Sequence, residues 1–297
     1  MIDLHVHSTF SDGSLTPEQL VDRARDIGLT AIALTDHDST GGINRFVAAC
    51  ETQRSEVRGQ RSDNGQALLG IQGVEISANV KHGTLHMLGY LIDHRDGDLE
   101  NVLERIREGR NIRNEEMLDR LKKLGLELSR KEVAAFAGDD VVGRPHFAQA
   151  LVARGWVAST EAAFELYLAK GKPGYADRFR LSPSDSISVI RKAGGVPILA
   201  HPFTLELDGK ALKKYVGELA DMGLQGIEAY YSEYSREQQQ EYLRLAEEFK
   251  LAVSGGSDFH GKLNPKIEIG TGFGSLRVPD GLVEELFRRV NDCGHGR

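Results

Sequence analysis

Short apolar runs alternate with helix-like patterns along much of the chain. Runs of β-branched and long aliphatic residues, bounded by Gly, Asp or Pro, predict strands at Ile2–Val6, Ala31–Thr35, Leu68–Ile76, Leu85–Leu91, Val196–Ala200, Gly226–Tyr230 and Leu251–Ser254. Helices are predicted between them, from Thr16-Pro17-Glu18 to about Gly28 and over Ser184–Ala193, 211–222 and 236–249. This alternation is typical of an α/β fold built from parallel βα units.

The pattern changes between about Leu99 and Arg180, where only helices are predicted. They cover Leu99–Leu124, Arg130–Ala137, His146–Arg154 and Thr160–Lys170. We therefore predict an inserted helical subdomain over residues 99–180, within a larger domain formed by residues 1–98 and 181–290. The polar stretch Arg54–Gly65 is predicted to be a loop, and the tail Cys293–Arg297 to be disordered or derived from a vector.

Composition excludes several classes of protein. The 297 residues are 40% hydrophobic and 27% charged, which is ordinary for a globular protein and unlike a disordered, collagen-like or coiled-coil chain. No apolar run reaches the roughly 18 residues that a membrane span needs. The start, Met1-Ile2-Asp3-Leu4-His5, lacks the features of a signal peptide. Cys50 and Cys293 form no disulfide framework, so we expect free thiols and a cytoplasmic protein.

Charge is unevenly distributed along the chain. The formal net charge of −7 argues against holding a long nucleic acid by bulk electrostatics, so no stable DNA complex is expected. Residues 101–180 nevertheless contain 15 Lys or Arg against 12 Asp or Glu, a net of +3. This local excess is either a solvated helical face or a set of cations that meet an anionic ligand.

Histidines and carboxylates gather where the predicted strands end. His5 and His7 have i, i+2 spacing, as do Asp258 and His260, and such residues in a strand point to the same side. Active-site residues of barrel enzymes collect at the carboxyl ends of parallel strands. Burying this many polar groups without partners would cost several kcal/mol, whereas a metal centre would satisfy them. The predicted metal ligands are His5, His7, Asp12, His37, Glu75, His86, His201, Asp258 and His260.

This ligand set predicts two or three divalent ions and a hydrolytic reaction. Imidazole and carboxylate ligands without thiolate suit Mn²⁺, Fe²⁺ or Zn²⁺, and this donor set does not choose among them. Of the three we expect Mn²⁺. Adjacent ions hold phosphate oxygens and generate a metal-bound hydroxide that attacks phosphorus in line. Asp38 is a candidate proton shuttle or substrate contact, or else a hydrogen-bonding partner of a ligand. Asp38, His201 and Asp258 are the residues predicted to act in catalysis.

The ordered motifs resemble those of the PHP (polymerase and histidinol phosphatase) superfamily. They are His5-x-His7 with Ser11-Asp12-Gly13, Thr35-Asp36-His37-Asp38, Gly73-Val74-Glu75, Ala200-His201-Pro202 and Ser257-Asp258-x-His260. The resemblance implies a distorted seven-stranded, TIM-like βα barrel with a trinuclear metal centre. It implies one ion bound by His5, His7, Glu75 and Asp258, a second by Glu75, His86 and His201, and a third by Asp12, His37 and His260.

Within that superfamily, the insertion resembles one branch through Gly143-Arg144-Pro145-His146 and Lys170-Gly171-Lys172-Pro173. That branch includes 3′,5′-nucleoside bisphosphate phosphatases and 5′→3′ exoribonucleases. Arg144 is expected to bind a second phosphate with His146 beside it, and the further substrate-binding candidates are Asp38, Lys170, Lys172, Tyr175 and Arg178. Arg110 and Arg113 are expected on the solvated surface of the long helix. His82, His94 and His295 are expected to be structural, and a structural role is also the alternative for His146.

The resemblance favours a phosphatase that removes the 3′-phosphate of a small nucleotide with two phosphates, such as 3′,5′-adenosine bisphosphate (pAp), leaving AMP. One alternative is a 5′→3′ exoribonuclease acting on short 5′-phosphorylated RNA. Another is a phosphatase for a small phosphomonoester such as histidinol phosphate. A metal-stabilised binding module without activity is disfavoured because no expected ligand is missing. No membrane partner is expected, and the sequence leaves the oligomeric state open.

Overall fold

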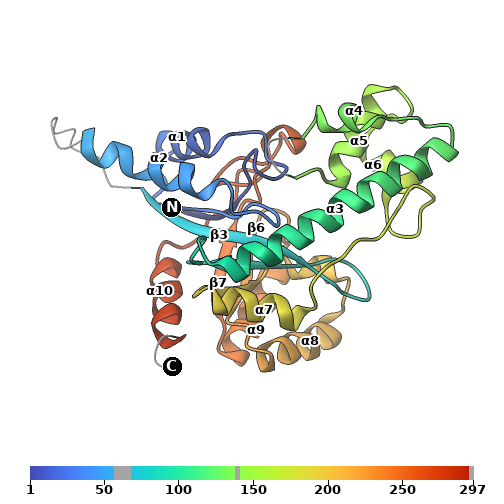
Figure 1. The fold of residues 1–297 in the computed structure, drawn as a ribbon. Helices are drawn as coiled ribbons and strands as arrows, with labels where there is room; N and C mark the ends of the chain where they lie inside the picture. Colours follow the sequence, from blue (N-terminus) through green and yellow to red (C-terminus); the bar gives the residue numbers. More distant parts are fainter. Residues whose placement is uncertain (57–67, 138–140, 294–297) are drawn as a thin grey trace.

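The computed structural model describes residues 1–56, 68–137 and 141–293 (Figure 1). The predicted loop beyond Glu56 and the predicted tail beyond Cys293 lie outside the described residues. Seven strands form one sheet in the order in which they occur along the chain. They are β1 Ile2–Val6, β2 Ala31–Leu34, β3 Leu69–Ala78, β4 Leu85–Tyr90, β5 Val196–Leu199, β6 Gly226–Tyr231 and β7 Ala252–Gly256.

The sheet curls until its two ends nearly meet. Strands β1 to β3 pair in parallel, as do β5 to β7. Beyond β7, Asp258 N donates to His5 O at 2.9 Å and His7 N donates to Phe259 O at 3.0 Å. These bonds join the segment after β7 to β1, so the predicted distorted seven-stranded α/β barrel is confirmed.

Strand β4 is antiparallel to both of its neighbours, which departs from the parallel βα units that the alternation predicts. Only residues 79–84 separate β3 from β4, and a parallel crossover needs a dozen or more. The reversal has a functional consequence. The start of β4, with His86 as its second residue, lies at the edge where the parallel strands end.

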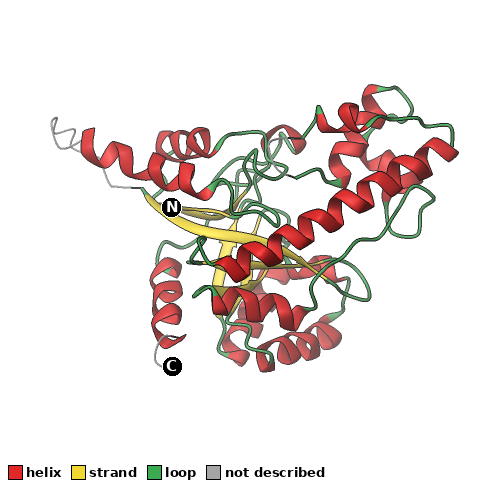
Figure 2. Cartoon of the chain, in the orientation of Figure 1, coloured by secondary structure: helices red, strands yellow, loops and turns green. Residues whose placement is uncertain are grey.

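Helices cover the outside of the barrel (Figures 1 and 2). They are α1 Pro17–Asp26, α2 Ile43–Glu56, α7 Pro183–Lys192, α8 Gly209–Asp221, α9 Arg236–Phe249 and α10 Leu282–Cys293. The predicted start of α1 is confirmed, because Thr16 and Gln19 form a capping box there. No helix among the described residues is both long and apolar enough to cross a bilayer.

Helices α2 and α10 were not predicted. Arg54–Glu56 belong to α2, so the expected loop begins too early. The helical signal in α2 is confined to its first part, where Ile43, Phe46 and Cys50 are buried, and its remainder is polar. The sequence of α10 does carry a helical signal, because Leu282, Val283, Leu286 and Val290 have helical spacing and pack into one hydrophobic cluster.

The inserted helices project from the barrel around the distal half of α3, Gly97–Lys123 (Figure 1). The others are α4 Arg130–Ala134, α5 Arg144–Ala153 and α6 Thr160–Ala163, followed by a π-helical turn at Phe164–Leu168. Helices α4 and α6 are shorter than predicted. The group has a hydrophobic cluster of its own, which includes Met117, Leu121, Phe147, Leu151 and Ala163. This cluster supports the division into barrel and subdomain, which stays a prediction.

Gly256 at the end of β7 permits a close approach to β1. A Cβ atom there would lie 2.4 Å from both the backbone nitrogen and the Cβ of His5. We expect Gly256→Ala to destabilise the metal-free protein by about 1–3 kcal/mol, because the strands must separate to admit a methyl group. Urea unfolding measures the loss, and Gly97→Ala, with no atom within 4 Å, is the control. Equal stability of the two variants would contradict this account of barrel closure.

Candidate active site

All of the sequence-predicted ligands lie together at one edge of the barrel. His5 lies in β1 and His7 directly follows that strand, while Glu75 lies in β3 and His86 in β4. The others lie in loops: Asp12 after β1, His37 after β2, His201 directly after β5, and Asp258 and His260 after β7. Groups whose candidate ligand atoms lie within 4.8 Å of one another are His5–His7–Glu75–Asp258, His7–Asp12–His37–His260 and His37–Glu75–His86.

Glu75 is at the centre of this cluster and is fully buried. One carboxylate oxygen, Oε2, lies 3.3 Å from His5, 3.2 Å from His7 and 2.9 Å from His37. The other, Oε1, lies 2.8 Å from His86 and 3.0 Å from His201. The two oxygens therefore face different sets of imidazoles, as the carboxylate of a bridging metal ligand does.

Asp12 contacts two further candidate ligands, His37 and His260. Its Oδ1 lies 3.1 Å from His260 Nε2, and its Oδ2 lies 3.8 Å from His37 Nε2. The rings of His7 and His260 stack with their centroids 4.1 Å apart. Since His37 faces both Asp12 and Glu75, its geometry suits either neighbouring group.

Buried ligand atoms in the cluster lack hydrogen-bond partners among the described residues. They are His5 Nε2, His7 Nε2, Asp12 Oδ1, His37 Nδ1, Glu75 Oε2 and Asp258 Oδ1. Each such atom costs about 1–3 kcal/mol when left unsatisfied. They converge on a common region and combine imidazole nitrogen with carboxylate oxygen, the donor set of Mn²⁺, Fe²⁺ and Zn²⁺. The residues present therefore fit divalent cations.

Mutual charge holds the carboxylates in their metal-binding form. Burial acts to raise the pKa of Glu75, but His37, His86 and His5 outweigh it and hold that pKa well below its ordinary value. Asp258 behaves in the same way, with its pKa lowered mainly by His5 and His260 against the effect of burial. Burial would lower the pKa of His7, but Asp258 and Glu75 raise it to about 10. The carboxylates thus carry negative charge, and a bound cation can replace the imidazolium groups as the positive charge beside them.

A surrounding layer of buried polar groups orients the ligands. Tyr231 donates to Asp258 Oδ2 at 2.7 Å, which leaves Oδ1 facing His5 and His7. Asp36 accepts from Ser8 and Ser11 and so fixes the loop that carries Asp12. His201 and Asp258 have φ angles of 24° and 56°, a region that is strained for side chains of this size. Such strain persists only where surrounding contacts hold the backbone in place.

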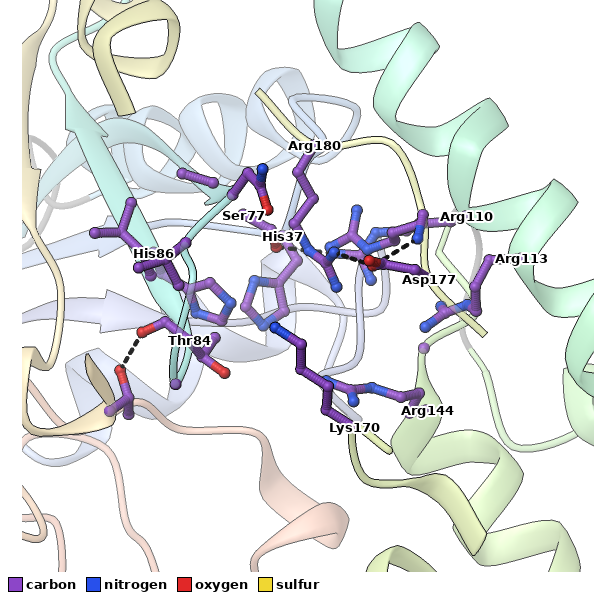
Figure 3. Close-up of a pocket in the computed structure, with 18 of the residues that line it drawn as sticks. His37, Ser77, Thr84, His86, Arg110, Arg113, Arg144, Lys170, Asp177 and Arg180 are labelled. Atoms are coloured by element: carbon purple, nitrogen blue, oxygen red, sulfur yellow. Dashed lines mark hydrogen bonds and ion pairs between the residues drawn. The ribbon is translucent and has the colours of Figure 1, made fainter. Parts of the chain in front are cut away.

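A cavity of about 340 Å³ extends from the cluster toward the inserted helices (Figure 3). Asp12, His37, His86 and His201 line its metal-facing end. The rest of the wall is strongly basic and contains Arg110, Arg113, Arg144, Lys170, Arg178 and Arg180. The arrangement joins a cation-binding cluster to an anion-binding wall within one cavity.

Asp38 organises part of this basic wall. Its Oδ2 accepts from Arg110 Nε at 2.9 Å and from Arg178 Nη1 at 3.4 Å, and its Oδ1 accepts from Ser77 N at 2.9 Å. Burial acts against the charge of Asp38, but Arg110 and Arg178 hold the pKa of its carboxyl well below the usual value. Asp38 is therefore a buried anion between the metal cluster and the arginines, and it is not among the residues that line the cavity.

Comparisons with known proteins identify the architecture. The PHP domain model matches residues 3–256. The chain belongs to the PHP domain family. It is 33% identical over 270 residues to a 3′,5′-nucleoside bisphosphate phosphatase of Chromobacterium violaceum, covering 87% of each chain. It is 36% identical over 280 residues to the 5′-3′ exoribonuclease Rnm of Salmonella typhimurium, covering 94% of this chain and 90% of the relative.

A solved structure agrees with this assignment. A protein of Bifidobacterium adolescentis, assigned as a metal-dependent phosphoesterase, superposes with a TM-score of 0.80 at 30% identity, covering 97% of this chain and 96% of the other. This PHP domain is accordingly a metal-dependent phosphoesterase, and the predicted enzyme class is confirmed. The relatives differ in substrate, so the family does not specify one.

The expected surface position of Arg110 and Arg113 in this PHP domain was wrong. Their exposed fractions are 8% and 3%, because the face of α3 that carries them lies against the cavity. Arg113 donates to Val142 O at 3.4 Å, and its Nε has no hydrogen-bond partner among the described residues. Burial and the neighbouring Arg110 and Arg178 hold the pKa of Arg113 well below its usual value.

The other substrate candidates of the PHP domain divide into two groups. Arg144, Lys170, Tyr175 and Arg178 line the cavity, and the guanidinium of Arg144 lies over the rings of Phe164 and Tyr175. His146 and Lys172 are not among the lining residues. His146 is 1% exposed and its Nδ1 accepts from Gly143 N at 3.0 Å, so it caps α5, while Lys172 is exposed to solvent.

Sequence reasoning missed Glu228 and Arg180. Glu228 is a buried acid inside the apolar strand β6, and that break in an apolar run is the signal that could have identified it. Arg180 lines the cavity and binds Asp177 at 2.6 Å, but its position after the insertion carries no local signal.

Proposed function

We propose that this PHP domain hydrolyses the phosphoester at the 3′ position of a nucleotide whose 5′-phosphate lies against the basic wall. The favoured substrate is pAp, with AMP and phosphate as products. The observation that carries the proposal is the cavity itself, which has a cation-binding cluster at one end and clustered arginines at the other. A substrate with two phosphates on one ribose matches both ends.

We assign the ligands in the sets that the family resemblance implies, and the contacts of Glu75 and Asp12 are compatible with them. One ion would be held by His5, His7, Glu75 and Asp258, a second by Glu75, His86 and His201, and a third by Asp12, His37 and His260. Divalent ions, with Mn²⁺ favoured over Fe²⁺ or Zn²⁺, supply Lewis acidity for phosphate oxygens and make an attacking water more acidic when bound. His201 and Asp258 would act as ligands held in strained backbone positions.

The protein's own side chains bind and orient the substrate. Arg110, Arg144 and Arg178 are proposed to contact the 5′-phosphate, because guanidinium groups bind phosphate oxygens in pairs. Asp38 is proposed to hold Arg110 and Arg178 in position rather than to shuttle protons, since it contacts both and does not line the cavity. Lys170 at the cavity wall adds further positive charge.

A 5′→3′ exoribonuclease activity is the second candidate. It would cleave the same bond between phosphorus and the 3′ oxygen, in a phosphodiester whose phosphate also carries the rest of the RNA chain. Lys170 lines the cavity, and its Nζ donates to the backbone oxygen of Lys81 at 3.2 Å, so this ammonium group is held where a phosphate of a longer chain could bind. The cytoplasm, with buried Cys50 as a free thiol, is the proposed compartment for either activity.

Phosphate release from pAp by Mn²⁺-loaded protein tests the proposal. We expect rapid release with 5′-AMP as the only nucleotide product, and loss of release after EDTA treatment followed by recovery with Mn²⁺. Release of 3′-AMP would reverse the proposed orientation. If pAp is inert while a short 5′-phosphorylated oligoribonucleotide is shortened, the exoribonuclease is the correct assignment. Faster turnover of histidinol phosphate would overturn both.

A further inference from the structure

Glu228 lies next to the cluster of candidate metal ligands and contacts two of them. It is fully buried in β6. Its Oε1 lies 3.0 Å from His5 Nδ1, and its Oε2 accepts a hydrogen bond from the backbone nitrogen of His201 at 2.8 Å. One oxygen of Glu228 thus contacts His5, a member of the His5–His7–Glu75–Asp258 group. The other oxygen contacts the backbone of His201, whose side chain lies beside His86.

The contact with His5 determines which ring nitrogen is free. Because a carboxylate only accepts hydrogen bonds when ionised, Nδ1 of His5 must donate to it. The opposite nitrogen, Nε2, is then the metal-binding atom, and it is one of the buried atoms without a hydrogen-bond partner among the described residues. Nε2 lies 3.3 Å from both Glu75 and Asp258.

The contact with His201 holds a strained backbone. His201 has a φ angle of 24°, and its side chain reaches Glu75 Oε1 at 3.0 Å and His86 Nδ1 at 3.3 Å. Without an acceptor for its backbone N–H group, the turn after β5 can relax toward an ordinary φ value. The ring of His201 would then move away from Glu75.

We propose that Glu228 is a positioning residue that couples two ions of the centre, by orienting His5 for one and His201 for the other. The inference rests on the metal centre of the proposed function and does not depend on which phosphoester is the substrate. Glutamine cannot replace Glu228, because it has one accepting oxygen where two donors must be satisfied. Glu228→Gln should therefore weaken two ions together.

Metal binding by the purified protein tests this coupling. The protein is stripped of metal, reloaded with Mn²⁺ and passed over a desalting column, and the retained metal is counted by mass spectrometry. We expect Glu228→Gln to retain two fewer ions than the wild type, each bound about 10–100-fold more weakly in titrations. The melting temperature of the metal-free variant should stay close to that of the metal-free wild type.

Comparison variants separate coupling from a general structural effect. Tyr231→Phe removes a hydrogen bond to Asp258 only, so it should weaken a single ion. Glu247→Gln makes the same chemical change at an exposed position and should retain all ions. Loss of only one ion in Glu228→Gln overturns the coupling, and wild-type retention overturns the inference entirely. Should Glu228→Gln fail to fold, Glu228→Asp must show the paired loss instead. Wild-type protein that binds no metal would contradict the proposed function itself.

Discussion

Replacing Glu75 with glutamine is expected to lower kcat/KM by about 10³-fold or more, because it removes the negative charge at the centre of the candidate metal ligands. The carboxylate lies within 3.3 Å of five imidazoles, more than any other side chain in the cluster contacts. Glutamine has nearly the same shape, so packing changes little. It presents one carbonyl oxygen to the cluster, whereas glutamate presents two charged oxygens that face different imidazole sets.

Two readouts together test this expectation. Metal retained after desalting should fall along with phosphate release, and excess Mn²⁺ should restore only a small part of the activity. Glu247→Gln again serves as the exposed control, with unchanged activity and metal content. If Glu75→Gln kept its ions and lost only activity, Glu75 would be acting on the substrate and its bridging role would be wrong.

The gathering of the candidate ligands at one edge could be predicted because its information is local. An i, i+2 pair such as His5 and His7 points to one side of any strand, and strand ends meet at one edge of a barrel. That logic does not depend on the details of packing. His86 also lies at this edge, although β4 is antiparallel, because the antiparallel strand starts where its neighbours end.

The basic wall could not be predicted, because it depends on how the insertion packs. Arg110 and Arg113 lie in a charged helix, and such arginines usually face solvent. Their burial follows from the position of α3 beside the cavity and from Asp38, which comes from a loop 72 residues earlier in the chain than Arg110. Neither contact can be predicted from the residues next to it in the sequence. For the same reason, Glu228 is visible only as an acid in an apolar strand.

Arg178 is expected to distinguish a substrate with two phosphates from one with a single phosphate. It is 5% exposed in its side chain and lines the cavity, and its bond to Asp38 is the longer of the two arginine contacts, at 3.4 Å. Burial and the nearby charge of Arg110, partly offset by Asp38, lower the pKa of Arg178 to about 9. Crowded positive charge of this kind is relieved when a phosphate dianion binds.

Arg178→Gln should therefore reduce kcat/KM for pAp by about 100-fold, since losing a buried charged contact to phosphate costs about 2–5 kcal/mol. Most of the loss should appear as a higher KM. With 3′-AMP, which lacks the 5′-phosphate, the same variant should differ from the wild type by less than about 3-fold, because no partner of Arg178 is present in that substrate.

Lys172→Gln removes an exposed cation that does not line the cavity, and it should leave the kcat/KM for both substrates unchanged. Equal losses with pAp and 3′-AMP would place the effect of Arg178 at the metal end of the cavity, and no loss with pAp would remove the 5′-phosphate from the basic wall.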